Sequence, residues 1–386
     1  MYKFLFPIFV SFCLFSCFDR TDAVGWEYNN PHNGGFQKVP YIEQETPPGM
    51  VMVEGAEILV NYTENKKDSL VVSTFYISKY EETNGQYLAY LSYAKRYYSE
   101  PTYKNALPDT TVWKKENIDS NKCIYFINNY LRSPYYEDFP VVGLTPIQIN
   151  NYASWKTDRL NEFILIREGV LPVHTEAKDS SNLFTTEAYL MNQYPTYDDE
   201  ILDLNPNTRG ELDERHVRME DGVLFPHIRM LTSTEWQLAH LNIGNEKHKY
   251  LKTAKPFRFK KYDKDEYFSY LNDVKKETKN EKFPVNIRIK GLNKVYYASR
   301  NNYEVYGLNT NASEIVGDSA FYQIIGGSFK DPIPDNSAVF VDGKYEITHP
   351  LHNSKSLDHN QSGLYGFRLA MDRLGSPIAF KRRTHK

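Results

Sequence analysis

The chain has 386 residues and a mass of 45.1 kDa, enough for one large domain or two average ones. Its 49 acidic and 46 basic residues leave a net charge of −3, which excludes a nucleic-acid-binding protein that relies on a broad basic face. The 31 tyrosines and 22 phenylalanines are spread over all parts of the sequence, so we expect most of these rings in the core rather than on a binding surface.

Residues 1–16 have the pattern of a bacterial lipoprotein export signal. One lysine precedes an apolar run of roughly 13 residues, which is short for a membrane span and typical of a signal peptide. Leu14 and Ser16 precede Cys17 as in a lipobox, and we therefore expect Cys17 to be lipidated. The alternatives are an ordinary signal peptide with a chance cysteine, or a buried strand.

Lipidation of Cys17 would leave Cys123 as the one free thiol of the mature chain, which would then have no disulfide. Residues 17–46 are polar and contain several turn clusters, so we expect a tether there. A folded domain is predicted for residues 47–375, followed by a basic tail at residues 376–386.

The predicted domain begins with two apolar, β-branched runs, Met50–Val60 and Ser69–Ile77, which favour a hairpin interrupted at Glu54-Gly55. Capping boxes then predict three helix starts, because a threonine is followed three residues later by glutamine or glutamate. The pairs are Thr83 with Gln86, Thr145 with Gln148, and Thr232 with Glu235. Helical spacing after Pro146 extends the second helix to about residue 169.

The second half of the chain is rich in predicted loops. Polar residues 179–221 and the Lys- and Glu-dense residues 245–282 both look like surface insertions. Short strands are expected at residues 296–299, 323–329, 338–341 and 363–372. Few helices, short strands and long connections indicate an α+β fold.

Seven motifs between Pro47 and Asp372 resemble, in the same order, the formylglycine-generating enzyme and sulfatase-modifying factor superfamily. They read PPGMVMVEGAEI, FYISKYEETNGQYLAYL, FPVVGLTPIQINNYASW, RMLTSTEWQLA, GLNTNASEIV, IIGGSF and GFRLAMD. The resemblance implies a single loop-rich α+β domain related to C-type lectins. Further stretches, including GWEYNNPHNGGFQ and NNYLRSPYYEDFPVVG, resemble the gliding-motility lipoprotein J branch in Bacteroidota, which is linked to type 9 secretion.

The resemblance also implies that this chain is not an enzyme. Catalytic members carry a cysteine pair shortly after the Gly-Gly-Ser motif, whereas no cysteine follows Ser328 here. Copper in its reduced state needs soft thiolate ligands, which carboxylates and amides do not replace. An enzyme with relocated metal chemistry stays open as an alternative.

The remaining motif residues are assigned by the same resemblance. Asn311 and Glu314 match positions that hold a structural calcium ion, and oxygen ligands suit calcium; a turn asparagine and a solvated glutamate are the alternative. No other cofactor is expected. The fold-motif residues are Gly326, Gly327, Arg229, Trp236 and Arg368, with the two arginines fastening chain segments through their fixed donors.

We therefore expect a non-catalytic, lipid-anchored assembly protein of the type 9 secretion and gliding machinery, at the periplasmic face of the outer membrane. Its expected partners are secretion and gliding lipoproteins and outer-membrane or periplasmic ring subunits, with membrane contact through the lipid and no nucleic acid. A glycan- or peptidoglycan-binding module is a further alternative. The sequence leaves the partner, the oligomeric state and the membrane leaflet open.

Overall fold

A computed structural model describes most of the predicted domain. The described residues are 44–63, 66–168, 170–171, 183–194, 217–219, 223–240, 289–298, 300–301, 303–317, 321–331, 339–341, 344–347, 355–356 and 361–374. The predicted signal, Cys17, most of the tether, the insertion at 245–282 and the basic tail lie outside these ranges. Within them, no helix is both long enough and apolar enough to cross a bilayer.

The described strands form three four-stranded sheets. The central sheet has the order β1 (Met50–Val53), β4 (Phe75–Ser78), β12 (Leu369–Asp372) and β5 (Ile228–Met230), and all its neighbours are antiparallel. The second sheet has the order β10 (Lys355–Ser356), β7 (Tyr322–Ile325), β6 (Ser313–Gly317) and β11 (Tyr365–Gly366). The outer sheet has the order β3 (Lys66–Val72), β2 (Ala56–Thr63), β9 (Lys344–Ile347) and β8 (Val339–Val341).

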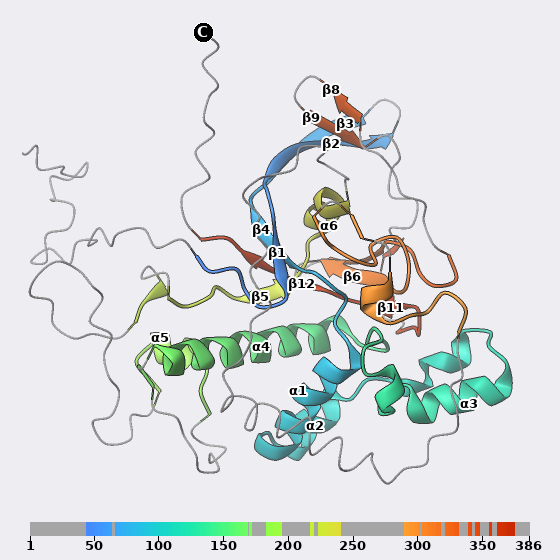
Figure 1. Cartoon of the computed structure of the whole chain (residues 1–386), viewed down its shortest axis with the longest axis horizontal. Helices are drawn as coiled ribbons and strands as arrows, with labels where there is room; N and C mark the ends of the chain where they lie inside the picture. The colour runs from blue at the N-terminus through green and yellow to red at the C-terminus, as the bar shows by residue number, and fades with distance from the viewer. Residues whose placement is uncertain are drawn as a thin grey trace, which may run out of the picture.

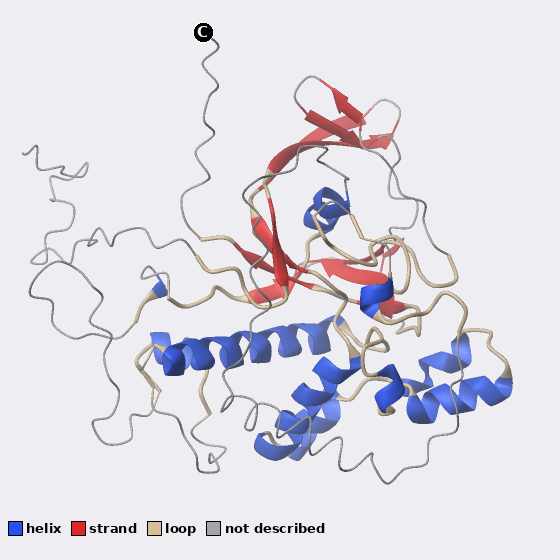
Figure 2. Cartoon of the chain, in the orientation of Figure 1, coloured by secondary structure: helices blue, strands red, loops and turns tan. Residues whose placement is uncertain are grey.

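Most of the helices gather on one side of the central sheet, as Figure 2 shows, and α6 lies between the sheets. The α-helices are α1 (Asn84–Tyr97), α2 (Glu100–Ala106), α3 (Ser120–Asn129), α4 (Pro146–Arg167), α5 (Thr186–Leu190) and α6 (Ser233–His240). Short 3-10 helices are η2 (Thr110–Lys115), η3 (Pro134–Tyr136) and η6 (Val295–Tyr297). This mixture of helices, sheets and long connections is the predicted loop-rich α+β class.

The predicted hairpin is confirmed, and its two halves belong to different sheets (Figure 1). Strands β1 and β4 pair in the central sheet, whereas β2 and β3 pair in the outer sheet. The change occurs at Gly55, where a Cβ atom would lie 2.6 Å from the carbonyl oxygen of Val72. Glycine is therefore needed where the two chain segments cross closely.

All three predicted capping boxes are present. In α1 and α4, the side chains of Thr83 and Thr145 accept from the third helical N–H, while a glutamine reaches back to the cap. In α6, the Thr232 hydroxyl accepts from Glu235 N at 3.2 Å and Thr232 N donates to the Glu235 carboxylate at 2.9 Å. Helix α4 ends at Arg167, close to the predicted end.

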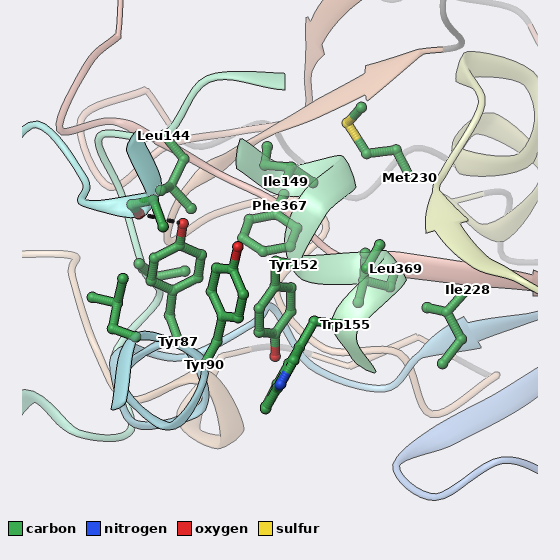
Figure 3. Close-up of a cluster of buried hydrophobic side chains, with 14 of the residues drawn as sticks. Tyr87, Tyr90, Leu144, Ile149, Tyr152, Trp155, Ile228, Met230, Phe367 and Leu369 are labelled. Atoms are coloured by element: carbon green, nitrogen blue, oxygen red, sulfur yellow. Dashed lines mark hydrogen bonds between the residues drawn. The ribbon is translucent and has the colours of Figure 1, made fainter. Parts of the chain in front are cut away.

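The expectation that the aromatic residues lie in the core is confirmed for α1 and α4. Tyr87, Tyr90, Tyr152 and Trp155 are buried and pack ring against ring, with centroid separations of 5.3–5.8 Å. Figure 3 shows these rings with Phe367 in one continuous cluster. Aromatic pairs in tilted or edge-to-face contact contribute about 0.5–1.5 kcal/mol per pair beyond the effect of their burial.

Two predictions from the second half of the sequence are wrong. Residues 295–297 form the 3-10 helix η6 instead of a strand. Residues 179–221 are not wholly a surface insertion, because Phe184 and Tyr189 are buried against Leu165 of α4. The two aromatic rings bury apolar area that helps to hold the described residues 183–194 against the core.

Candidate functional site

The motif residues Trp236, Glu314 and Arg368 meet in the interior, although more than 130 residues separate the first from the last. The capped start of α6 positions Trp236, whose indole Nε1 donates to Glu314 Oε2 at 2.9 Å. Arg368 donates from Nε to Glu314 Oε1 at 2.7 Å and forms a salt bridge to the same oxygen at 2.6 Å. Both charged side chains are almost fully buried, so the pair holds together the elements that carry it.

The other donors of Arg368 bind backbone carbonyls on separate segments. They reach the carbonyl oxygens of Ser78 at 3.2 Å and Tyr306 at 2.6 Å. One guanidinium therefore links the end of β4, strand β6 and the loop around residue 306. Its planar, fixed donors make arginine the suitable residue for such a junction.

Gly326 lies directly against this cluster at the end of β7. Its φ of +88° is in the left-handed region, and a Cβ atom there would lie 2.9 Å from both Leu308 O and Trp236 Cζ2. The next glycine, Gly327, is buried. Ser328 is also buried, and its hydroxyl accepts from Lys330 N and Asp331 N at 3.2 Å each, so Ser328 stabilises a turn.

Glu81 also belongs to the site, although it was not among the residues predicted from the sequence. It lies between β4 and α1, is almost fully buried, and accepts hydrogen bonds from Asn311 Nδ2 and from Ala312 N at 2.9 Å. Glu81 lies two residues before the N-cap Thr83. An acidic residue near the start of a helix is common and is usually exposed to solvent, where it interacts favourably with the helix dipole. Only the folded chain reveals that it is buried beneath residues 307–312.

The cluster contains more acidic than basic groups, because the buried carboxyl groups of Glu81 and Glu314 lie near a single guanidinium, that of Arg368. Burial raises the pKa of Glu81 to about 8, against the opposing effect of Arg368. Burial also raises the pKa of Glu314, which Arg368 likewise opposes. Among its described contacts Arg368 bonds to Glu314 and not to Glu81, so the guanidinium compensates the charge of Glu81 less directly than that of Glu314.

The residues assigned to calcium by resemblance already have protein partners. Glu314 accepts from Arg368 and Trp236 through its two oxygens. The Asn311 side-chain oxygen accepts from Asn293 N at 3.0 Å. A guanidinium bonded to the carboxylate repels a divalent cation, so this donor set does not fit calcium well, and the assignment stays a hypothesis.

Arg229 forms a second junction, at the edge of the central sheet. It lies on β5 and donates to both carboxylate oxygens of Glu235, at 2.7 and 2.9 Å, and also to Asp372. Glu235 is the glutamate of the α6 capping box. Arg229 therefore joins β5 and the end of β12 to the first turn of α6.

Lys330, two residues after Ser328, forms an ion pair. Lys330 Nζ lies 2.9 Å from Glu116 Oε2, and the buried Glu116 carboxylate also accepts from Gly363 N at 3.0 Å. Cys123 is a free cysteine on α3. Among the residues that the structure describes, no group of three or more His, Cys, Asp or Glu side chains is placed to hold a metal ion.

A comparison with protein families matches residues 35–373 to the sulfatase-modifying factor enzyme 1-like domain. Among solved structures, the crystal structure of CarF is similar, with 15% sequence identity and a TM-score of 0.36 over 85% of this chain and 99% of that chain. Treponema denticola variable protein 1 is similar with 14% identity and a TM-score of 0.32, over 87% of this chain and 98% of that chain. No curated protein sequence matches the chain.

Proposed function

The chain belongs to the sulfatase-modifying factor enzyme 1-like domain family, and from this premise we propose that it is a non-catalytic, lipid-anchored assembly protein of the bacterial envelope. Its specific place would be the type 9 secretion and gliding machinery, at the periplasmic face of the outer membrane. The domain would act by presenting a rigid surface to secretion and gliding lipoproteins and to envelope ring subunits.

The observation that carries this proposal is the loop after the Gly-Gly-Ser motif. Catalytic relatives keep a thiol pair shortly after this serine, and the present sequence continues without any cysteine to its last residue. Lys330 is instead bonded to the buried Glu116. This lysine–carboxylate pair holds Lys330 in place and supplies no soft ligand for copper.

The buried charges of the site give a second line of support. Arg368, Glu314, Arg229 and Glu235 each bond to other chain segments, so their charges stabilise junctions. A catalytic acid, base or nucleophile needs a free position facing a substrate. The contacts of these four residues support a role in holding the fold together.

The finer parts of the proposal rest on the sequence resemblance. The motifs at residues 25–37 and 128–143 support the gliding-motility lipoprotein J branch, and the shared fold motifs support a C-type-lectin-related domain. The lipobox pattern before Cys17 supports a lipid anchor, which would hold the domain at the membrane through the tether of residues 17–46.

The test is purification of the tagged protein from membranes of its native bacterium after mild cross-linking. We expect type 9 secretion or gliding subunits to co-purify, and labelled palmitate to be incorporated in the wild type but not in Cys17→Ala. Recovery without any such subunit would overturn the assembly role.

A separate arm tests the enzymatic alternative. We expect no conversion of a cysteine-containing sulfatase peptide to formylglycine, and no stoichiometric copper or iron in the purified protein. Formation of formylglycine, or copper or iron bound in proportion to the protein, would support an enzyme whose metal site lies elsewhere in the chain.

A further inference from the structure

A small surface patch next to the buried cluster combines two tyrosines with two cations and a carboxylate. We name it the tyrosine patch; its residues are Lys79, Tyr80, Arg300, Glu304 and Tyr306. The Tyr80 and Tyr306 rings are half-buried, with centroids 4.9 Å apart. Lys79 Nζ lies 6.0 Å from one ring centroid and 5.8 Å from the other.

The loop at residues 300–306 holds the patch in a fixed conformation. Its ends pair through an isolated bridge between Arg300 and Tyr306. Inside the loop, the Asn301 side-chain oxygen accepts from Tyr303 N and Val305 N at 3.0 Å each, and its amide donates to Ala239 O at 2.6 Å. The loop is therefore closed on itself and joined to the last turn of α6.

The backbone of Tyr306 is fixed by the interior as well. Its N–H donates to Lys79 O at 2.9 Å, and its carbonyl accepts from the buried Arg368 at 2.6 Å. A surface that is already held in one conformation loses little entropy when a partner binds. The tyrosine patch is therefore preorganised by the same arginine that joins the sheets.

Glu304 adopts a conformation that its side chain does not favour. Its φ is +63°, in the left-handed region, which is unfavourable for residues other than glycine and asparagine. Its carboxylate lies 3.0 Å from Lys79 Nζ and 3.8 Å from Arg300. A partly exposed ion pair adds little to the stability of the fold. The contacts of Glu304 give a better reason for a glutamate here, because they orient two cations beside the tyrosine rings.

We propose that the tyrosine patch is a docking site for an acidic peptide segment of a partner protein. The two cations and Glu304 leave one positive charge in excess, and the Arg300 side chain is 59% exposed, so its guanidinium can bind an incoming carboxylate bidentately. Tyrosine and arginine are the residues that most often dominate binding energy at protein interfaces. This inference rests on the proposed assembly role and names the chemistry of the partner.

A sugar ligand fits the patch less well than a peptide carboxylate. A sugar ring binds by stacking on an open aromatic face. Lys79 lies over both tyrosine rings and is held there by Glu304, so a sugar on that side would have to displace an ion pair. A carboxylate, in contrast, can bind the exposed Arg300 guanidinium without displacing Lys79 from Glu304.

The test uses fluorescence anisotropy of a labelled, glutamate-rich peptide with the full mature chain at low ionic strength. We expect saturable binding that weakens as salt is added, and a much weaker signal for the same peptide with each glutamate replaced by glutamine. Arg300→Ala and Tyr80→Ala should each weaken binding roughly tenfold or more, as removal of an interface hot spot does.

Lys104→Ala is the matched control, because it removes an exposed cation that pairs with Glu100 on α2 without touching the patch. It should bind as the wild type does, and thermal unfolding should show that all variants are folded. The proposal is overturned if the wild type does not bind the acidic peptide, if Lys104→Ala weakens binding as much as Arg300→Ala, or if an oligosaccharide binds in preference. This peptide assay is independent of co-purification with secretion subunits, so either proposal can fail while the other stands.

Discussion

The indole ring of Trp236 occupies the space that a side chain on Gly326 would need. The ring atom Cζ2 would lie 2.9 Å from an added Cβ atom, and Leu308 O would lie equally close on another side. Gly326→Ala must therefore move the tryptophan that bonds to Glu314. We expect a loss of several kcal/mol in the free energy of unfolding, about 3 or more, from combined backbone strain and overpacking.

Gly49→Ala is the matched control for this substitution. Gly49 also has a left-handed φ, +75°, but nothing lies within 4 Å of its added Cβ. Gly49→Ala should therefore lower the free energy of unfolding only by the backbone strain, about 1 kcal/mol. Equal losses for the two variants, measured by urea unfolding, would contradict the packing account of Gly326.

Removing one partner of the buried pair Arg368–Glu314 should be severe. Arg368→Met leaves the Glu314 carboxylate without its cation in the interior, and we expect a loss of about 3–5 kcal/mol. The double variant Arg368→Met with Glu314→Leu should lose less than the sum of the two single variants. A double-mutant cycle measured by chemical unfolding checks this, and additive losses would show that the pair is not coupled.

Stability should fall as pH rises from about 4.5 to 8. The pKa of Glu81 is raised from 4.5 to about 8 in the folded chain, so folding takes up a proton in this range and the stabilisation is lost as the folded group ionises. Because Glu81 binds at most one proton, it can lower the free energy of unfolding by at most about 1.4 kcal/mol per pH unit. Glu81→Gln should flatten it, even though the amide cannot replace both accepted hydrogen bonds.

Comparison of pH profiles isolates Glu81 from other titrating groups. Burial also lowers the pKa of His227, which reduces stability on acidification below about pH 6.5 in both proteins. The difference between wild type and Glu81→Gln removes this shared effect. If the difference in the free energy of unfolding between wild type and Glu81→Gln is constant from pH 5 to 8, then Glu81 is ionised in the folded state over this whole range.

Calcium should change stability only if it displaces Arg368 from Glu314. A site saturated at a hundredfold excess over its Kd would add about 2.7 kcal/mol. From the contacts of Glu314 and Asn311 we expect no difference in Tm between calcium and chelator. A rise with calcium but not with magnesium, lost in Glu314→Gln, would instead support the calcium site suggested by the resemblance.

Glu304→Gly should leave stability unchanged or raise it slightly. The substitution relieves a left-handed conformation that costs about 1 kcal/mol, and it removes exposed ion pairs of similar or smaller value. Thermal unfolding checks the sign. A loss above 2 kcal/mol, a figure of roughly twice either effect, would show that Glu304 is retained for folding rather than for orienting Lys79 and Arg300.

Local signals in the sequence predicted the local structure well. The three capping boxes lie where Thr83, Thr145 and Thr232 placed them, because a cap depends on residues only three positions apart. The hairpin and the break at Gly55 were also visible, since strand runs and glycine are local features. The family motifs also pointed to Trp236, Glu314 and Arg368, which meet in the buried cluster.

Long-range contacts could not be predicted in the same way. Nothing around Glu81 in the sequence shows that it will be buried beneath Asn311, which lies 230 positions away. Likewise, Phe184 and Tyr189 are buried in a cluster with Leu165 of α4, which lies about twenty positions earlier in the chain. The strand predicted at residues 296–299 pairs with none of the described strands, and residues 295–297 form a 3-10 helix.

The two ends of the described domain flank a single strand, and this has a mechanical consequence. Strands β1 and β12 both pair antiparallel with β4, and Met50 lies opposite Ser78 while Asp372 lies opposite Phe75. The chain therefore enters and leaves at opposite ends of β4. Tension applied between these two points would load both ladders in shear, so that their hydrogen bonds resist together instead of opening one after another. The central sheet is therefore arranged to resist force that is applied between residues 50 and 372.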